Sequence, residues 1–319
     1  MHLVHSRDFP PTETSPRTRA LIETVSEAQL RTWVNQIALP RHFTENWDQN
    51  RRTADWLVEK FETLGFSVQR QGDFSNIIAY PPNPPASVIL VGAHYDSVPG
   101  SPGADDNASA VAALLGCAVA CSNLNPAPPV VFVAFNREEE ALAGSSDFVN
   151  NYLPTAPFTI ECAHILEMLG YAPGMPGSQR VPAGLPIDLG DRGDFLGLLV
   201  NDRSANILES IISRAATYTR ELPVTGLQVV AGAERVLPVL ARSDHVPFWR
   251  RDIPAVMWTD TAEFRNPHYH QPTDTPETLN YHFLKRVTQL LTASIMDRPP
   301  PARFAPAICL TPELFEPLS

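Results

Sequence analysis

Residues 88–135 read VILVGAHYDSVPGSPGADDNASAVAALLGCAVACSNLNPAPPVVFVAF, and the class of fold can be argued from them outward. Each end is a short apolar run rich in β-branched residues, Val88–Val91 and Val130–Phe135, which is typical of buried strands. Between them, residues 108–121 have the composition of a buried helix. A strand, a helix and a second strand in this order predict two parallel strands with the connecting helix packed on one face of the sheet.

The same alternation continues along the chain. Further strands are predicted at Asn76–Tyr80, His164–Met168, Leu227–Val230 and Ala255–Thr259, and further helices at 144–152, 204–218 and 277–296. Before residue 75, apolar residues at helical spacing predict two amphipathic helices, one through Leu30, Trp33, Val34 and Ile37 and one through Ala54, Leu57, Phe61 and Leu64. The chain is therefore expected to be an α/β protein with a mostly parallel sheet and helices on both faces.

The 319 residues fit one large α/β domain. We expect a single catalytic domain over residues 1–298, which includes the N-terminal helices, and a proline-rich tail over 299–319. Residues 170–202 contain several prolines and glycines and fit neither period, so an ordered surface loop is expected there. This loop and the aromatic residues Phe248, Trp249, Trp258 and Phe264 either line a substrate pocket or take part in ordinary packing.

Charge and composition exclude several classes of partner. The 35 acidic residues outnumber the 24 Lys and Arg, and the formal charge of −11 argues against a nucleic-acid or anionic-membrane surface. The longest nearly unbroken apolar run, residues 110–121, is shorter than the roughly 20 residues of a membrane span. The amino terminus lacks the apolar core of a signal peptide, so a cytoplasmic protein or a processed secreted form is expected. Nothing indicates an oligomeric state.

Histidine or carboxylate groups stand at or just after the ends of four predicted strands. These residues are His94 and Asp96, the run Glu138–Glu140, Glu167, and the pair Tyr269 and His270. Ligands of open α/β sheets bind outside the carboxyl ends of the strands, so these groups are expected to meet there. Cys117 and Cys121 show no CxxC spacing and are predicted to be small core residues.

The residue types favour a metal site. His94 and Asp96 form a His-x-Asp arrangement, and a metal-bound imidazole usually donates its second N–H to a carboxylate. Asp106 directly precedes the helix, where it caps the helix or bridges two cations, and both roles are compatible. Glu167 stands within an apolar strand, where an unpaired carboxylate is costly, so it indicates either a buried salt bridge or a metal.

Two histidines and three carboxylates without a thiolate suit two divalent cations of borderline softness. Zinc is the leading candidate, with manganese or cobalt as alternatives. A metal that lowers the pKa of water, together with a spare glutamate that moves its proton, predicts hydrolysis of an amide.

The residues also resemble a known family. The segments Gly92–Ser97, Gly103–Asn107, Glu138–Glu140 with Gly144-Ser145, Ser243–Phe248 and Pro267–Thr275 are similar, in order, to motifs of the co-catalytic zinc aminopeptidases. These are the bacterial leucyl aminopeptidase-like metallopeptidases, a group that also includes glutaminyl cyclases. The resemblance covers about residues 75 to 295. It implies the three-layer zinc-exopeptidase fold, a phosphorylase/hydrolase-like α/β domain with a central, mostly parallel mixed sheet flanked by helices.

The resemblance also implies roles for individual residues. By motif position, His94 and Glu167 would hold one zinc ion, Glu139 and His270 the other, and Asp106 would bridge both. Glu138 matches the general base and acid, Asp96 the partner that orients His94, and Tyr269 the group that polarises the scissile carbonyl. A cis peptide bond is implied after Asp106. The expected activity is removal of N-terminal residues from a peptide or aminoacyl substrate.

One departure from the family leaves alternatives open. Most relatives carry Asp where this chain has Glu167, which puts the first of the two zinc ions in question. Glutaminyl cyclases use one zinc ion at the equivalents of Asp106, Glu139 and His270, together with an aspartate like Asp244, so a cyclase that forms N-terminal pyroglutamate is the alternative. The intact His94 and Asp96 argue against a cyclase. A binding protein without catalytic activity is the second alternative.

Overall fold

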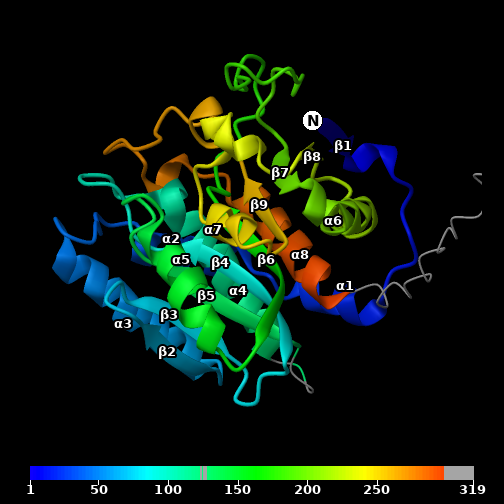
Figure 1. The fold of residues 1–319 in the computed structure, drawn as a ribbon. Helices are drawn as coiled ribbons and strands as arrows, with labels where there is room; N and C mark the ends of the chain where they lie inside the picture. Colours follow the sequence, from blue (N-terminus) through cyan, green and yellow to red (C-terminus); the bar gives the residue numbers. More distant parts are fainter. Residues whose placement is uncertain (123, 125–127, 298–319) are drawn as a thin grey trace, which may run out of the picture.

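The computed structural model describes residues 1–122, 124 and 128–297, so the predicted tail 299–319 lies outside the described residues. Its centre is a nine-stranded sheet in the order β1-β8-β7-β9-β6-β4-β5-β3-β2 (Figure 1). The strands are β1 His2–His5, β2 Ser67–Gln71, β3 Asn76–Tyr80, β4 Ser87–His94, β5 Val130–Phe135, β6 Thr159–Glu167, β7 Leu196–Asn201, β8 Val224–Val229 and β9 Ala255–Thr259. The helices are α1 Pro16–Glu23, α2 Glu27–Ile37, α3 Trp47–Thr63, α4 Ala110–Ser122, α5 Ala143–Asp147, α6 Ala205–Tyr218, α7 His245–Arg250 and α8 Tyr281–Met296.

The sheet is mixed, as the resemblance implies. Its centre, β5-β4-β6-β9, is parallel, whereas β3 pairs antiparallel with β5 and β7 pairs antiparallel with β9. The prediction for residues 170–202 was wrong at its end, because Leu196–Asn201 is the buried strand β7. The prolines and glycines that precede it hid this short apolar run. The edge strands β1 and β2 were also missed, since they are short and partly exposed.

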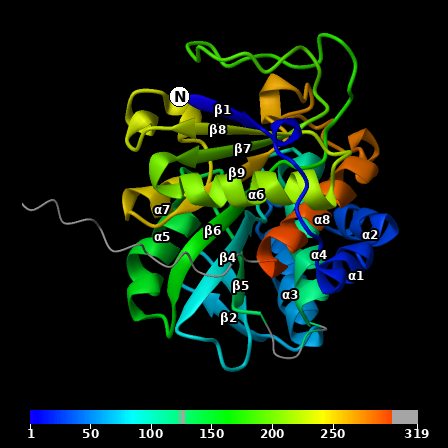
Figure 2. The same ribbon diagram turned by 90° about the vertical axis from the view of Figure 1, so that its right-hand side faces the viewer.

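Alternating side chains of the strands build two cores, one on each face of the sheet. In β5, Val130, Phe132 and Ala134 belong to a core shared with α2, α3, α4, α6 and α8. The neighbouring Val131, Val133 and Phe135 belong to a second core with Phe148 and with Phe248 of α7. Figure 2 shows α2, α3, α4 and α8 on one side of the sheet and α5 and α7 on the other. Because a strand with two apolar faces must be covered on both, the result is a three-layer α/β/α domain.

The central helix α4 is buried almost completely. Together with the π-helical turn Ala104–Ser109, it forms a 19-residue segment, Ala104–Ser122, that is long and apolar enough to cross a membrane by length and composition alone. However, 94% of its apolar stretch is buried inside the protein. The core helix of a globular domain can have the same length and composition. Cys117 and Cys121 are both buried on this helix, which confirms them as core residues.

The strand register places the chemistry at one edge of the sheet. His94 at the end of β4 pairs with Phe135 at the end of β5, and Glu167 at the end of β6 pairs with Thr259 at the end of β9. The neighbouring parallel strands therefore end at nearly the same height along the sheet. The loops that follow them, which carry the predicted site residues, start side by side.

Candidate active site

Two groups of metal-ligating side chains meet at this edge and share Asp106. His94 Nε2 lies 3.3 Å from Asp106 Oδ1 and 3.4 Å from Glu167 Oε1. On the other side, His270 Nε2 lies 3.2 Å from Asp106 Oδ2 and 3.3 Å from Glu139 Oε2. Within each group, the potential ligand atoms lie within 4.8 Å of one another. The five residues predicted as ligands are thus brought together, with one carboxylate oxygen of Asp106 facing each group.

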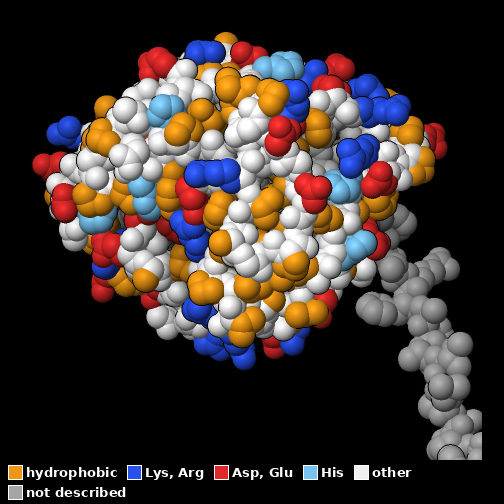
Figure 3. Space-filling model, turned by 90° about the horizontal axis from the view of Figure 1, so that it is seen from above, with side chains coloured by type: hydrophobic (Ala, Val, Ile, Leu, Met, Phe, Trp, Pro, Cys, Tyr) orange, Lys and Arg blue, Asp and Glu red, His pale blue; other side chains and the backbone are white. Residues whose placement is uncertain are grey.

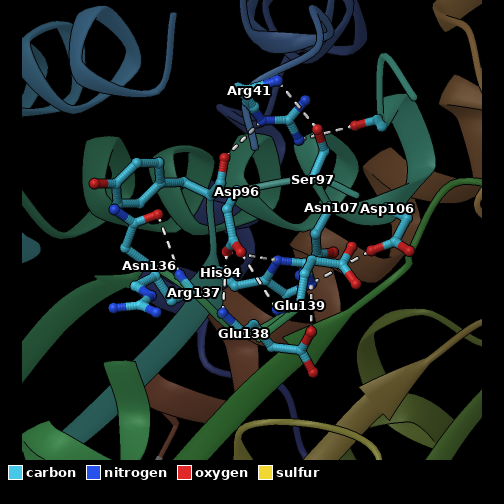
Figure 4. Close-up of polar contacts among 12 residues, drawn as sticks. Arg41, His94, Asp96, Ser97, Asp106, Asn107, Asn136, Arg137, Glu138 and Glu139 are labelled. Carbon is cyan, nitrogen blue, oxygen red and sulfur yellow. Dashed lines mark hydrogen bonds and ion pairs between the residues drawn. The ribbon is translucent and has the colours of Figure 1, made fainter. Parts of the chain in front are cut away.

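Asp96 connects the histidine to the glutamate loop. Its Oδ1 lies 3.4 Å from His94 Nδ1, and its two carboxylate oxygens accept hydrogen bonds from the backbone N–H groups of Glu138 and Glu139 at 3.2 and 3.3 Å (Figure 4). A carboxylate held in this way fixes the start of the loop that carries the two glutamates, and it lies beside the ring of His94.

Glu138 lies beside the two ligand groups, and with His94 and Glu139 it forms a third set of side chains that could hold a metal ion. Its Oε2 is 4.0 Å from His94 Nε2, so its carboxylate points toward the same space (Figure 4). Burial raises the pKa of Glu138 well above its usual value; His94 opposes this shift, whereas the charges of Glu167 and Glu139 add to it. A carboxyl group with a raised pKa holds a proton more readily than a free glutamate, which suits a group that accepts and returns a proton.

Tyr269 and His270 come from the proline-framed loop that follows β9. The two rings stack, with centroids 3.7 Å apart, and the hydroxyl of Tyr269 accepts a hydrogen bond from Arg242 Nη2 at 3.0 Å. Although burial alone would lower it, hydrogen bonds to Asp106 and Glu139 raise the pKa of His270 to about 10. The phenol of Tyr269 thus lies next to His270.

Glu167 is longer than the aspartate of most relatives, and its second oxygen has a partner of its own. Oε2 accepts a hydrogen bond of 2.7 Å from the buried hydroxyl of Ser243, while Oε1 faces His94. Asp244 is buried next to Ser243, and burial, with a contribution from the charge of Glu167, raises its pKa to about 7. Asp244 is thus a buried acidic residue next in sequence to the serine that binds Glu167.

The donor set fits divalent metal ions. It consists of imidazole nitrogen and carboxylate oxygen, the ligands that zinc and manganese accept. Three carboxylates converge on two histidines in a buried space, an arrangement of like charges that needs added positive charge. In addition, Glu139 Oε1 is buried without a hydrogen-bond partner among the described residues, so it is free to bind a cation.

Several supporting residues had no role in the sequence interpretation. Asp274 accepts the backbone N–H groups of Asp105 and Asp106 at 2.9 and 3.1 Å. Asn107 follows Asp106 through a cis peptide bond, as the resemblance implies, and its side chain bonds to the backbone of β6 at Leu166 and of Met168. No periodicity marks isolated polar residues of this kind, although Asp274 stands in a segment that the resemblance already singled out.

An apolar cavity of about 140 Å³ opens beside Glu167 and Tyr269. It is lined by Leu185, Phe195, Leu198, Leu227, Met257 and Phe264, among others. The segment 170–202 and Phe264 thus contribute to the wall of a pocket, whereas Phe248, Trp249 and Trp258 belong to the two cores. Of the four aromatic residues, Phe264 therefore lines a pocket, and the other three take part in ordinary packing.

Comparison with known proteins gives consistent results. YfbL of Escherichia coli (strain K12), named an uncharacterized protein, is 32% identical over 271 residues, or 80% of this chain and 82% of that protein. Among solved structures, BSAP, a zinc aminopeptidase from Bacillus subtilis, is 26% identical to this chain, with a TM-score of 0.52. The superposition covers 70% of this chain and 49% of the BSAP chain. Glutaminyl cyclase from Porphyromonas gingivalis is 19% identical with a TM-score of 0.64 over 85% of this chain and 98% of its own, which shows a shared fold.

A model of one protein family matches residues 76–295, the segment that contains the predicted ligands His94, Asp106, Glu139, Glu167 and His270. The match starts at β3 and ends within α8, so it includes the central parallel strands and the loops at their carboxyl ends. The chain belongs to Peptidase family M28.

Proposed function

We propose that this peptidase is a zinc aminopeptidase that removes N-terminal residues from peptides. The observation that carries the proposal is the position of Asp106 between two complete ligand groups, with Glu138 beside them. One group, His94 with Glu167, and the other, Glu139 with His270, would each hold one ion. The kinship with a zinc aminopeptidase of Bacillus subtilis supports the choice of metal and reaction.

The residues around the ligands supply the remaining chemistry. The bound ions would polarise the scissile carbonyl and lower the pKa of water. Glu138 takes a proton from the attacking water and passes it to the leaving amine, because its carboxylate lies beside the ligands and its pKa is raised. The hydroxyl of Tyr269 donates a hydrogen bond to the carbonyl oxygen as negative charge develops there, and Arg242 holds this hydroxyl in place.

The surroundings favour a particular substrate. Buried carboxylates around the ligands attract the free ammonium of a peptide, and the adjacent apolar cavity accepts an apolar first side chain. On the face shown in Figure 3, acidic and basic side chains are interspersed, and they do not gather into one basic patch. We therefore propose a peptide as substrate and no nucleic-acid partner.

A peptide panel tests this function. The protein loaded with zinc is incubated with otherwise identical peptides that begin with Leu, Gln or Asp, and the products are identified by mass. We expect fastest release of the free residue from the Leu peptide, because leucine fits the apolar cavity, and slowest release of Asp, because its carboxylate is repelled. No hydrolysis of any peptide by protein that holds zinc would refute the proposal.

The same assay distinguishes the cyclase alternative. Asp106, Glu139 and His270 form a complete single-metal group, and the fold is shared with a glutaminyl cyclase. Ring closure of the Gln peptide loses ammonia and leaves a pyroglutamyl peptide, whereas hydrolysis releases free glutamine. About two zinc ions per chain support the peptidase. Normal zinc binding without either product would indicate the third possibility, a binding protein without catalysis.

Removal of metal should destabilise the protein. At a free zinc concentration about 1,000 times the dissociation constant, binding to the native state adds about 4 kcal/mol to the free energy of unfolding. We therefore expect a chelator to lower the melting temperature by several degrees, and added zinc to restore it, as measured by scanning calorimetry. Magnesium serves as the control, because it binds imidazole ligands poorly. Equal melting temperatures with and without zinc would contradict the assigned ligands.

A further inference from the structure

Arg41 is a charged residue buried completely between α2 and α3, in a segment outside the part of the chain that the family model matches. Its guanidinium donates to three backbone carbonyl oxygens of the loop 95–103: Nε to Tyr95 at 2.6 Å, Nη1 to Pro102 at 2.5 Å and Nη2 to Gly103 at 2.9 Å. The backbone N–H of Arg41 also donates to Ser97 Oγ at 3.1 Å (Figure 4).

These acceptors flank two of the proposed ligands. Tyr95 stands between His94 and Asp96, and Gly103 precedes Asp106 by three residues. One planar guanidinium therefore ties together the two ends of the loop 95–103, which connects β4 to the turn before α4. A guanidinium suits this task better than an ammonium, because its donors point in fixed, divergent directions.

The same residue is connected to the glutamate loop. The carbonyl of Arg41 accepts a hydrogen bond of 2.9 Å from Asn50 Nδ2, and Asn50 and Asn136 exchange two side-chain hydrogen bonds of 2.9 and 3.0 Å. Asn136 Oδ1 then accepts the backbone N–H of Arg137 at 3.1 Å. Since Glu138 and Glu139 follow directly, a continuous set of hydrogen bonds runs from Arg41 to the loop that carries these two glutamates.

The charge of Arg41 also acts on the site. Burial lowers its pKa to about 10, and the carboxylates of Asp96, Asp106, Asp274 and Glu139 act in the opposite direction. The guanidinium therefore remains protonated at neutral pH and offsets part of the repulsion among those carboxylates. Without it, the carbonyls of Tyr95 and Pro102 would lose the donor that Arg41 supplies, which is costly, whereas Gly103 would keep the backbone N–H of Ala108.

We propose that Arg41 is a positioning residue through which the N-terminal segment sets the geometry, and hence the metal affinity, of the site. The proposal rests on the metal ligands of the proposed function, but it concerns binding of the ions and can be tested without a substrate. Arg41 touches neither the metal ligands' donor atoms nor the substrate pocket; it acts through the backbone of the loops.

The test compares Arg41→Lys with a matched control, Arg214→Lys. Lysine keeps the charge but cannot donate to three divergent carbonyls. Arg214 is also buried, and it donates to the backbone carbonyls of Ser210 and Asp297 at the far end of α6 and α8. Zinc dissociation constants are measured by competition with a chromophoric chelator, and kcat and KM are measured with the Leu peptide at saturating zinc.

We expect Arg41→Lys to weaken zinc binding about tenfold or more, which is typical of residues that orient metal ligands, and to lower kcat more than it raises KM. Arg214→Lys should lower the melting temperature and leave zinc affinity within about twofold. Wild-type zinc affinity in Arg41→Lys would overturn the proposal. If wild-type protein cleaves no peptide but Arg41→Lys still loses affinity, the positioning role stands and the peptidase proposal falls.

If Arg41→Lys does not fold, a second variant, Asn50→Ala, tests the positioning role of Arg41. Asn50→Ala breaks the connection between Arg41 and Asn136 and leaves the guanidinium in place. We expect it to weaken zinc binding about threefold to tenfold, because residues that orient metal ligands directly change the affinity by about tenfold or more and Asn50 acts one step further away. Unchanged affinity in folded Asn50→Ala, with Arg41→Lys unfolded, would also overturn the proposal.

Discussion

Glu138→Gln is expected to lower kcat about 10²- to 10⁴-fold while the zinc content stays unchanged. Glutamine has nearly the same size as glutamate, so the packing beside His94 is retained. Its amide cannot take a proton from water and return it to the leaving amine. Steady-state kinetics with the Leu peptide, together with metal analysis of the same preparation, measures both quantities.

Glu140→Gln is the matched control, because it alters the same run of three glutamates. Glu140 pairs with Arg137 and His42, outside both ligand groups, and glutamine retains an acceptor oxygen for Arg137. We expect its kcat to stay within a few-fold of wild type. A Glu138→Gln variant with full zinc content and more than about a tenth of the wild-type kcat would remove Glu138 from the proton transfer.

Asp106→Asn is expected to abolish activity and to reduce the bound zinc below one ion per chain. Each oxygen of Asp106 faces a different histidine, His94 or His270, so one substitution weakens both ligand groups. Even residues that only orient ligands change metal affinity by about 10- to 100-fold, and loss of a shared ligand should exceed that range. Metal analysis after gel filtration and titration with zinc measure the change.

The control for this change is Asp48→Asn, an equivalent substitution at an exposed position in the first turn of α3. It should leave zinc content, kcat and KM unchanged. If Asp106→Asn retained two zinc ions, Asp106 could not be the shared ligand. If it lost just one, the two groups would bind their ions independently, and Asp106 would be needed for one of them alone.

The fold was predictable to the extent that its elements are periodic. The runs at Val88–Val91 and Val130–Phe135 and the apolar helix between them predict a parallel strand pair, and the structure confirms it. The strand β7 was missed, because its short sequence LGLLVN, which follows a proline-rich loop, resembles any other apolar segment. Whether such a run becomes a strand depends on a neighbour, here β9, that lies far away in the sequence.

The site was predictable for a related reason. Residues at the ends of neighbouring parallel strands are brought together by the sheet itself, so His94, Glu139 and Glu167 could be assigned to one place from strand ends and chemistry. Arg41 could not be assigned in this way. It follows a helix in a short irregular segment, and its partners are backbone carbonyl groups, which leave no mark on the sequence.

The sequence alone therefore specified the class of fold, the metal-binding residue types and the family resemblance, because hydrophobic periodicity and donor chemistry are local properties of the chain. Tertiary structure decided which carboxylate oxygen faces which histidine, that Ser243 takes the second oxygen of Glu167, and that an apolar cavity opens beside the ligands. Those features depend on distances between segments far apart in the chain, which are fixed only when the sheet, its two cores and the loops pack together.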